Sequence, residues 1–62
     1  MDKELQFGKT YKFMTDLGKE HKAMYVGKQF GNIICFKFEN DFIRTYDNNF
    51  IKEIEEYNES KN

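Results

Sequence analysis

A single cysteine, Cys35, constrains what this chain can fold into more than any other feature. At 62 residues, one hydrophobic core is barely large enough to fold alone. Small domains often add disulfides or a structural metal. One cysteine and one histidine, His21, supply neither an intrachain disulfide nor a closed zinc site. Stability therefore depends on apolar packing or self-association, and seven Phe and four Tyr bring large buried areas to that packing.

The hydrophobic pattern after Phe7 has a period of two, which is typical of half-buried strands. It predicts a first strand over about residues 9–15, with Tyr11 and Phe13 on its apolar face. Turn residues follow this strand, and a second strand is expected over residues 21–29.

A glycine within the second strand, Gly27, indicates a bulge or a sharp coil. Gly31-Asn32 is a two-residue hairpin signal between apolar runs. It leads into residues 33–38, the clearest strand in the chain. Ile34 and Phe36 hold the same parity in that strand, so both are expected in the core.

The C-terminal third contains a fourth strand, expected over residues 42–46, and an ambiguous segment. Apolar residues between positions 50 and 57 have helical spacing, and Asp47, Asn48 and Asn49 are candidate helix N-caps. A fifth strand in the same place would cover the open edge of a small sheet. We favour a short strand, alone or after a helical turn, with Ile54 buried.

Four or five short strands with tight turns predict one mainly β domain, a small antiparallel barrel with loosely ordered ends at residues 1–6 and 58–62. Four segments carry a resemblance: FGKTYKF at 7–13, MYVG at 24–27, IICFKF at 33–38 and IKEI at 51–54. In order and spacing they resemble the SH3-like small barrels among short phage and prophage proteins of Gram-positive bacteria. The resemblance implies an SH3-like barrel, and a phage-encoded protein that modulates a bacterial host factor. The Trp and acidic-loop pattern of eukaryotic peptide-binding SH3 domains is missing, so polyproline binding is not implied.

The motifs that could carry chemistry favour structural roles. Gly8-Lys9-Thr10 matches the end of a phosphate-binding loop, but Lys3 stands where that loop needs its first glycine. His21 lies among charged neighbours, which indicates an exposed hairpin edge and not a positioned general base. Cys35 lies in mid-strand, as a small buried hydrophobe does. We therefore expect no enzyme, no cofactor and no metal.

The unpaired thiol favours a reducing compartment. No segment approaches the roughly 18 apolar residues of a membrane span, and the N-terminus lacks a hydrophobic signal segment. We expect a cytoplasmic protein, located in the bacterial host cell if the resemblance holds, with no membrane partner.

Charge is distributed unevenly along the chain. Residues 1–31 contain six Lys against four acidic residues, whereas residues 32–62 contain four basic against seven acidic residues. An acidic face beside aromatic side chains would attract a basic partner and anchor it, although a merely solvated face fits the same residues. The expected protein-binding residues are Glu39, Asp41, Phe42, Tyr46, Asp47, Glu53 and Glu56.

A nucleic-acid-binding barrel is the alternative function. Small barrels bind nucleic acid by stacking bases on aromatic rings while lysines neutralise phosphates. The residues that would form such a surface are Lys12, Lys19, Lys22, Tyr25, Lys28 and Phe30. The leading hypothesis remains a non-catalytic module that binds an unidentified bacterial protein, and homodimerisation through strand edges fits either function.

Overall fold

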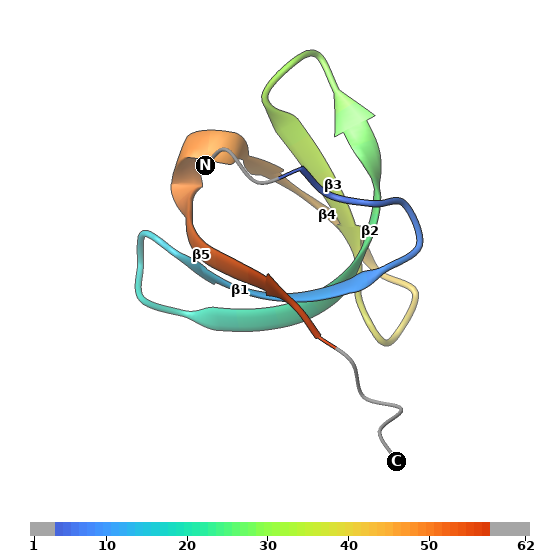
Figure 1. The fold of residues 1–62 in the computed structure, drawn as a ribbon, viewed down its shortest axis with the longest axis horizontal. Coiled ribbons are helices and arrows are strands. Elements are labelled where there is room, and N and C mark those ends of the chain that lie inside the picture. The colour runs from blue at the N-terminus through green and yellow to red at the C-terminus, as the bar shows by residue number, and fades with distance from the viewer. Residues whose placement is uncertain (1–3, 58–62) are drawn as a thin grey trace.

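The computed structural model describes residues 4–57, which form one antiparallel sheet of five strands (Figure 1). The elements are β1 (Thr10–Thr15), β2 (Glu20–Gln29), β3 (Ile33–Lys37), β4 (Ile43–Asp47), a 3-10 turn (Asn48–Phe50) and β5 (Ile51–Glu56). The strand order is β4-β3-β2-β1-β5, so β4 and β5 are the two edges. The expected mainly β, antiparallel fold is confirmed. Residues 1–3 and 58–62, expected to be loosely ordered, lie outside the described residues.

The long strand β2 gives the sheet its curvature. Its first half pairs with β1 and its second half pairs with β3. The register shifts between Tyr25 and Gly27, and Gly27 has a φ of 134° that side-chain-bearing residues rarely adopt. This confirms the bulge expected at the glycine. A bulge bends and twists a strand, and Figure 1 shows the sheet curling around its concave face.

The β1–β2 turn lies where the sequence predicted a turn, whereas the β2–β3 turn differs from the prediction. Gly18 has a φ of 80° in the β1–β2 turn and donates its N–H to Thr15 O at 2.9 Å. Our prediction of a two-residue loop between β2 and β3 is wrong. Gln29 pairs with Ile33, so the loop has three residues, and Phe30 joins Gly31 in the positive-φ region. Since φ is 40° for Phe30, an aromatic residue occupies a conformation that glycine normally takes.

The core lies on the concave face and is mainly aromatic. It confirms the predictions for Tyr11, Phe13, Ile34 and Phe36, of which the last three are almost fully buried. The Tyr11 hydroxyl keeps a polar partner, because it accepts the N–H of Gln6 at 2.9 Å. The full cluster is Tyr11, Phe13, Ala23, Tyr25, Ile34, Phe36 and Ile51.

The C-terminal segment is a strand after a helical turn, as we favoured. Of the three candidate caps, Asp47 is the one used: its side chain accepts the N–H of Asn49 at 2.8 Å and so caps the 3-10 turn. The register with β1 then shifts, so that Ile51 pairs with Thr15 and Ile54 pairs with Phe13. This bulge explains why apolar residues three apart, a helical spacing, share one face of a strand. Ile54 was expected to be buried; it is half-buried against the core, and Ile51 is the buried residue of β5.

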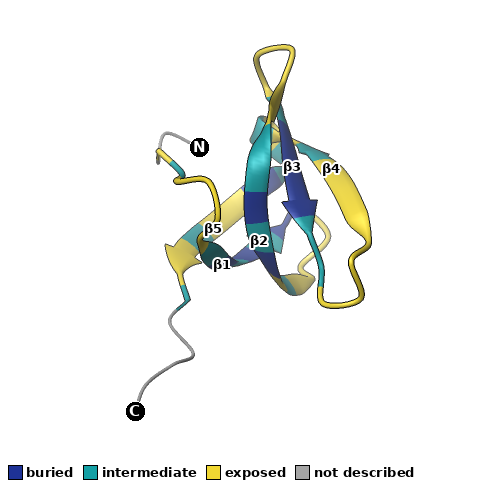
Figure 2. Cartoon of the chain, turned by 90° about the vertical axis from the view of Figure 1, so that its right-hand side faces the viewer, coloured by how far each residue is buried: buried dark blue, intermediate teal, exposed yellow. Residues whose placement is uncertain are grey.

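Burial is uneven between the strands. Figure 2 shows the buried positions concentrated on β1, β2 and β3, whereas β4 is largely exposed. The exposed edge strand and its surroundings are therefore the first place to look for a binding site.

Candidate functional site

The residues expected to form an acidic protein-binding surface lie in separate parts of the sheet. Two of the carboxylates are ion-paired: Asp41 lies 3.7 Å from Lys37, and Glu56 lies 3.1 Å from Lys9. Asp47 caps the 3-10 turn. These three groups already have partners within the protein.

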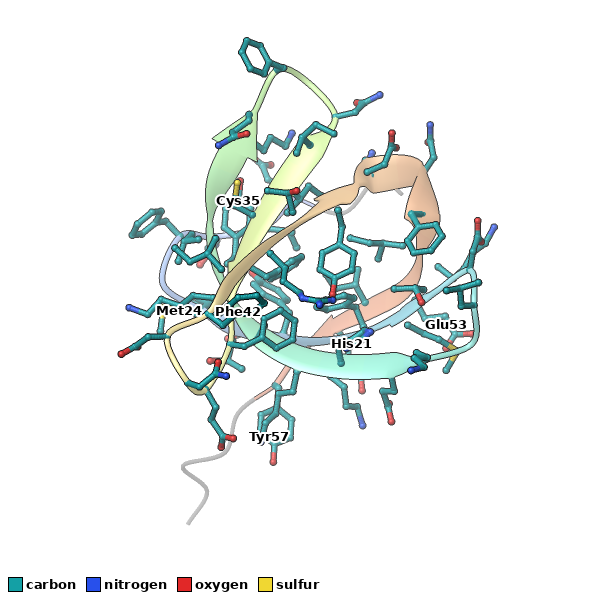
Figure 3. The ribbon with its side chains drawn as sticks, turned by 180° about the vertical axis from the view of Figure 1, so that it is seen from behind. His21, Met24, Cys35, Phe42, Glu53 and Tyr57 are labelled. Atoms are coloured by element: carbon teal, nitrogen blue, oxygen red, sulfur yellow. The ribbon has the colours of Figure 1, made fainter. Side chains whose placement is uncertain are left out.

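The remaining members of that set divide between the two edges of the sheet. Glu39 is exposed in the β3–β4 turn, whereas Glu53 lies on β5 and pairs with Met14 of β1. Figure 3 shows Glu53 far from Phe42. Phe42 and Tyr46 line one pocket, and Glu39 and Asp41 line a different one.

The lysines expected for nucleic-acid binding are partly engaged with other side chains. Lys12 lies between two carboxylates, 3.7 Å from Glu20 and 3.8 Å from Glu55. The Lys22 ammonium lies 4.5 Å from the centre of the Tyr57 ring, a cation–π contact. Neither lysine presents an isolated positive charge to a phosphate.

The other members of the nucleic-acid set lie at distant ends of the sheet. Lys19 is in the β1–β2 turn, and Lys28 is near the opposite end of β2. Phe30 is 96% exposed at the tip of the β2–β3 hairpin. Tyr25, which we took for a surface aromatic, is buried on the core face with Ala23. The set therefore supplies one exposed ring and no continuous basic groove.

Cys35 and His21, the two side chains considered above as a nucleophile and a general base, are both packed against other groups. Cys35 is buried in β3, as expected. The expectation of an exposed His21 is wrong: it is half-buried, and its ring lies 5.5 Å from that of Phe13 and 5.9 Å from those of Phe38 and Tyr46. Between residues 4 and 57, no group of three or more His, Cys, Asp or Glu side chains is placed to hold a metal ion.

His21 forms part of a pocket at the concave side of β4, with a volume of about 260 Å³. Figure 3 shows His21 near the middle of the view, with Phe42 to its left. Drug-sized ligand sites usually exceed roughly 300 Å³, so this pocket suits a single side chain. The lining residues, here called the β4 pocket, are His21, Phe38, Asn40, Phe42, Arg44 and Tyr46.

Arg44 supplies the formal positive charge of the β4 pocket. It pairs with Phe36 in the sheet and therefore shares the concave face with it. Its guanidinium carbon lies 5.5 Å from the centre of the Phe42 ring. Across residues 4–57, no carboxylate lies within ion-pair distance of Arg44.

Tyr46 lines the inner side of the pocket and carries an unsatisfied polar atom. Its hydroxyl oxygen is buried and has no hydrogen-bond partner among the described residues. Most buried polar atoms in proteins have a partner. The pocket therefore combines an unpaired cation with unused hydrogen-bonding capacity.

The backbone of β4 is the second element of the site. At one end of the β3–β4 pair, the Phe38 N–H donates to Phe42 O at 2.8 Å. At the other end, the Asn48 N–H donates to Asn32 O at 2.7 Å. These bonds fix the alternation of the antiparallel ladder, in which even-numbered residues of β4 bond to β3.

The odd-numbered residues of β4, Ile43 and Thr45 within the strand and Asp47 at its end, consequently direct their N–H and C=O groups away from β3. Phe42 and Ile43 lie at the start of this edge and are 53% and 56% exposed. An edge with free backbone groups and exposed apolar side chains is a template for a further strand.

The sequence contained signals for two residues of the β4 pocket, His21 and Arg44, that were not among the expected protein-binding residues. His21 shares the parity of Ala23 and Tyr25, but its charged neighbours led us to an exposed position. Arg44 shares the parity of Phe42 and Tyr46, which places it on the concave face. Strand alternation alone, without regard to the charge of neighbouring residues, predicts that both side chains lie on the concave face.

In the part of the chain that is described, no helix is long and apolar enough to cross a membrane. Comparisons with protein-family models, with curated proteins and with solved structures found no match.

Proposed function

We propose that this protein is a non-catalytic interaction module that binds an extended segment of a partner protein along β4. The observation that carries the proposal is an exposed edge strand whose outward N–H and C=O groups border a side-chain pocket. In strand addition, backbone hydrogen bonds provide affinity, and pockets for alternate side chains provide specificity. Both elements occur together at β4.

The apolar side chains of the edge support the same function. Phe42 lines the concave pocket, and Ile43 points to the opposite face of the sheet. They would contact both faces of an added strand. The other edge, β5, carries Glu53, Glu55 and Glu56, and charged side chains protect an edge from pairing.

The resemblance to short phage and prophage proteins adds a proposal about the partner. It implies a bacterial host protein that the module would bind and modulate in the cytoplasm of the host cell. We assign partner binding to β4 and not to the acidic surface expected from the sequence. The aromatic members of that surface line the β4 pocket, whereas its carboxylates are dispersed.

Affinity capture with two proline variants tests the use of β4. The Thr45 N–H points away from β3, so Thr45→Pro removes a donor that only an added strand would use. Glu56→Pro is the matched control. Since the Tyr57 N–H donates to Thr10 O at 2.8 Å, the adjacent Glu56 N–H points away from β1 at the other edge.

Immobilised protein and both variants are exposed to nuclease-treated bacterial lysate, and retained proteins are identified by mass spectrometry. The proposal expects one protein retained by the parent and by Glu56→Pro but lost with Thr45→Pro, while all three unfold at similar temperatures. Equal retention by Thr45→Pro contradicts strand addition at β4. Loss of every partner on nuclease treatment instead supports a nucleic-acid-binding barrel, and a dimer that Thr45→Pro dissociates makes a second copy the occupant.

A further inference from the structure

One formally charged residue lines the β4 pocket, and its charge is positive. Arg44 lies at its mouth, and none of the six lining residues is acidic. In contrast, four lysines are paired with carboxylates elsewhere in residues 4–57: Lys9, Lys12, Lys37 and Lys52.

 The five ion pairs thus involve four lysine side chains, because Lys12 contacts both Glu20 and Glu55. Arg44 differs from these lysines in having an aromatic contact and no carboxylate.

The hydrogen-bonding groups of the pocket also favour an anion. An arginine guanidinium presents only donors, and a histidine ring and a tyrosine hydroxyl can each donate as well. His21 and Tyr46 line the pocket beside Arg44, and the Tyr46 hydroxyl has no partner among the described residues. Hydrogen bonds to a charged group are shorter and stronger than neutral ones. A planar anion would therefore meet, at the exposed Arg44, a guanidinium that no carboxylate of the described residues neutralises.

We propose that the β4 pocket binds the carboxylate of an acidic side chain of the partner segment, an inference that rests on the proposed strand addition at β4. Arg44 bonds to β3, so on its free side it would form a non-hydrogen-bonded pair with the added strand. Side chains approach most closely in such pairs. A Glu or Asp opposite Arg44 would lie on the concave face, beside the rings of Phe42 and Tyr46.

A carboxylate fits this site better than a nucleic-acid phosphate. A nucleic acid presents phosphates at regular intervals and needs a series of cations along its path. The β4 pocket offers one formal cation, while Lys9, Lys12 and Lys37 are ion-paired and Lys19 lies in a distant turn. One isolated guanidinium bordered by aromatic rings suits one carboxylate at the end of a short side chain.

The probe is 3-phenylpropionate, with 3-phenylpropionamide as its uncharged control, titrated into labelled protein and followed by NMR. The acid should shift the signals of Phe42, Arg44 and Tyr46 and saturate, and the amide should bind about ten-fold more weakly or not at all. Arg44→Gln should abolish this preference. Lys28→Gln, which removes a cation near the other end of β2, should preserve it, and both variants should keep the parent's folded spectrum.

Equal binding of acid and amide, or an undiminished preference in Arg44→Gln, overturns the carboxylate pocket. Saturable binding of phenyl phosphate without binding of the carboxylate also overturns it, in favour of a phosphate ligand. The small acid needs no free strand edge, so Thr45→Pro should bind it as the parent does. Acid binding therefore tests the pocket, whereas the dependence of partner capture on Thr45 tests strand addition, and the two can fail separately.

Discussion

The rings of Phe13 and Phe36 stack with their centroids 4.5 Å apart and their planes 22° apart, although β2 separates the strands that carry them. A flat sheet would hold side chains on β1 and β3 two strand spacings apart, or roughly 9–10 Å. The curvature of β2 closes that distance. The stack is thus both a product of the bulge at Gly27 and the centre of the core.

Replacing Phe36 with Ala should lower the free energy of unfolding by about 3–5 kcal/mol, because it removes a fully buried ring and leaves a cavity against Phe13 and Tyr25. That loss is most of the stability of so small a domain. Chemical denaturation measures the difference. Phe42→Ala, at an exposed position, is the control and should change stability much less; an unchanged midpoint for Phe36→Ala would show that this residue is not central to the core.

Replacing Tyr46 with Phe should raise the free energy of unfolding by about 1 kcal/mol, because the buried hydroxyl has no partner to lose. The larger change, Tyr46→Ala, should destabilise the protein, since the ring packs edge-on against Phe13 at 5.3 Å. From the sequence we had expected Tyr46 on a protein-binding surface, where its replacement would not affect folding. Thermal unfolding of both variants distinguishes the two effects, and a destabilised Tyr46→Phe would reveal a hydrogen bond to that hydroxyl.

Alternation along the strands was enough to predict the strand positions and the centre of the core. Tyr11, Phe13, Ile34 and Phe36 needed only a period of two, because each lies in a regularly paired stretch. Ile54 lies on the core face but is only half-buried, because β5 is an edge strand, and Ile51, brought to the same face by the bulge in the register with β1, takes the buried position. Bulges depend on the partner strand and are not encoded in the spacing of one segment.

The candidate site was harder to predict than the core. The expected acidic surface grouped residues that are close in sequence, whereas the sheet places β4 and β5 at opposite edges. Phe42 and Tyr46 were both singled out from the sequence, and both line the β4 pocket. The partners of those rings, His21 and Phe38, come from β2 and from the end of β3, and only the folded sheet brings them together.

At the β2–β3 hairpin, Phe30→Gly should leave stability unchanged or increase it by up to about 1 kcal/mol. Relief of the left-handed conformation of Phe30 is worth roughly 1–2 kcal/mol, and the added backbone entropy of glycine costs roughly 0.5–1 kcal/mol. Gly31→Ala is the opposite case. Its φ of 72° would strain alanine and lower the melting temperature, although no atom obstructs a Cβ there. A marked loss of stability in Phe30→Gly would show that the exposed ring makes a structural contact.

Charge reversal on β5 distinguishes the dispersed carboxylates from the β4 edge. Glu53→Lys with Glu56→Lys should leave folding nearly unchanged, because exposed ion pairs such as Glu56 with Lys9 contribute little. Once a partner has been captured, binding at β4 predicts that its dissociation rate is preserved in this double variant. Stopped-flow or surface-based kinetics can measure this rate. A much slower association that depends less on salt concentration would instead show that the acidic residues attract the partner.

Amide hydrogen exchange in the free protein and in the complex with the captured partner tests strand addition at β4 most directly. The Ile43 and Thr45 N–H groups point away from β3 and should exchange readily in the free protein. On binding, both should exchange at least about ten-fold more slowly, as expected of newly formed backbone hydrogen bonds. The outward Glu56 N–H on β5 should not change. Protection of Glu56 with no change at Ile43 and Thr45 would contradict the use of β4 as the binding edge.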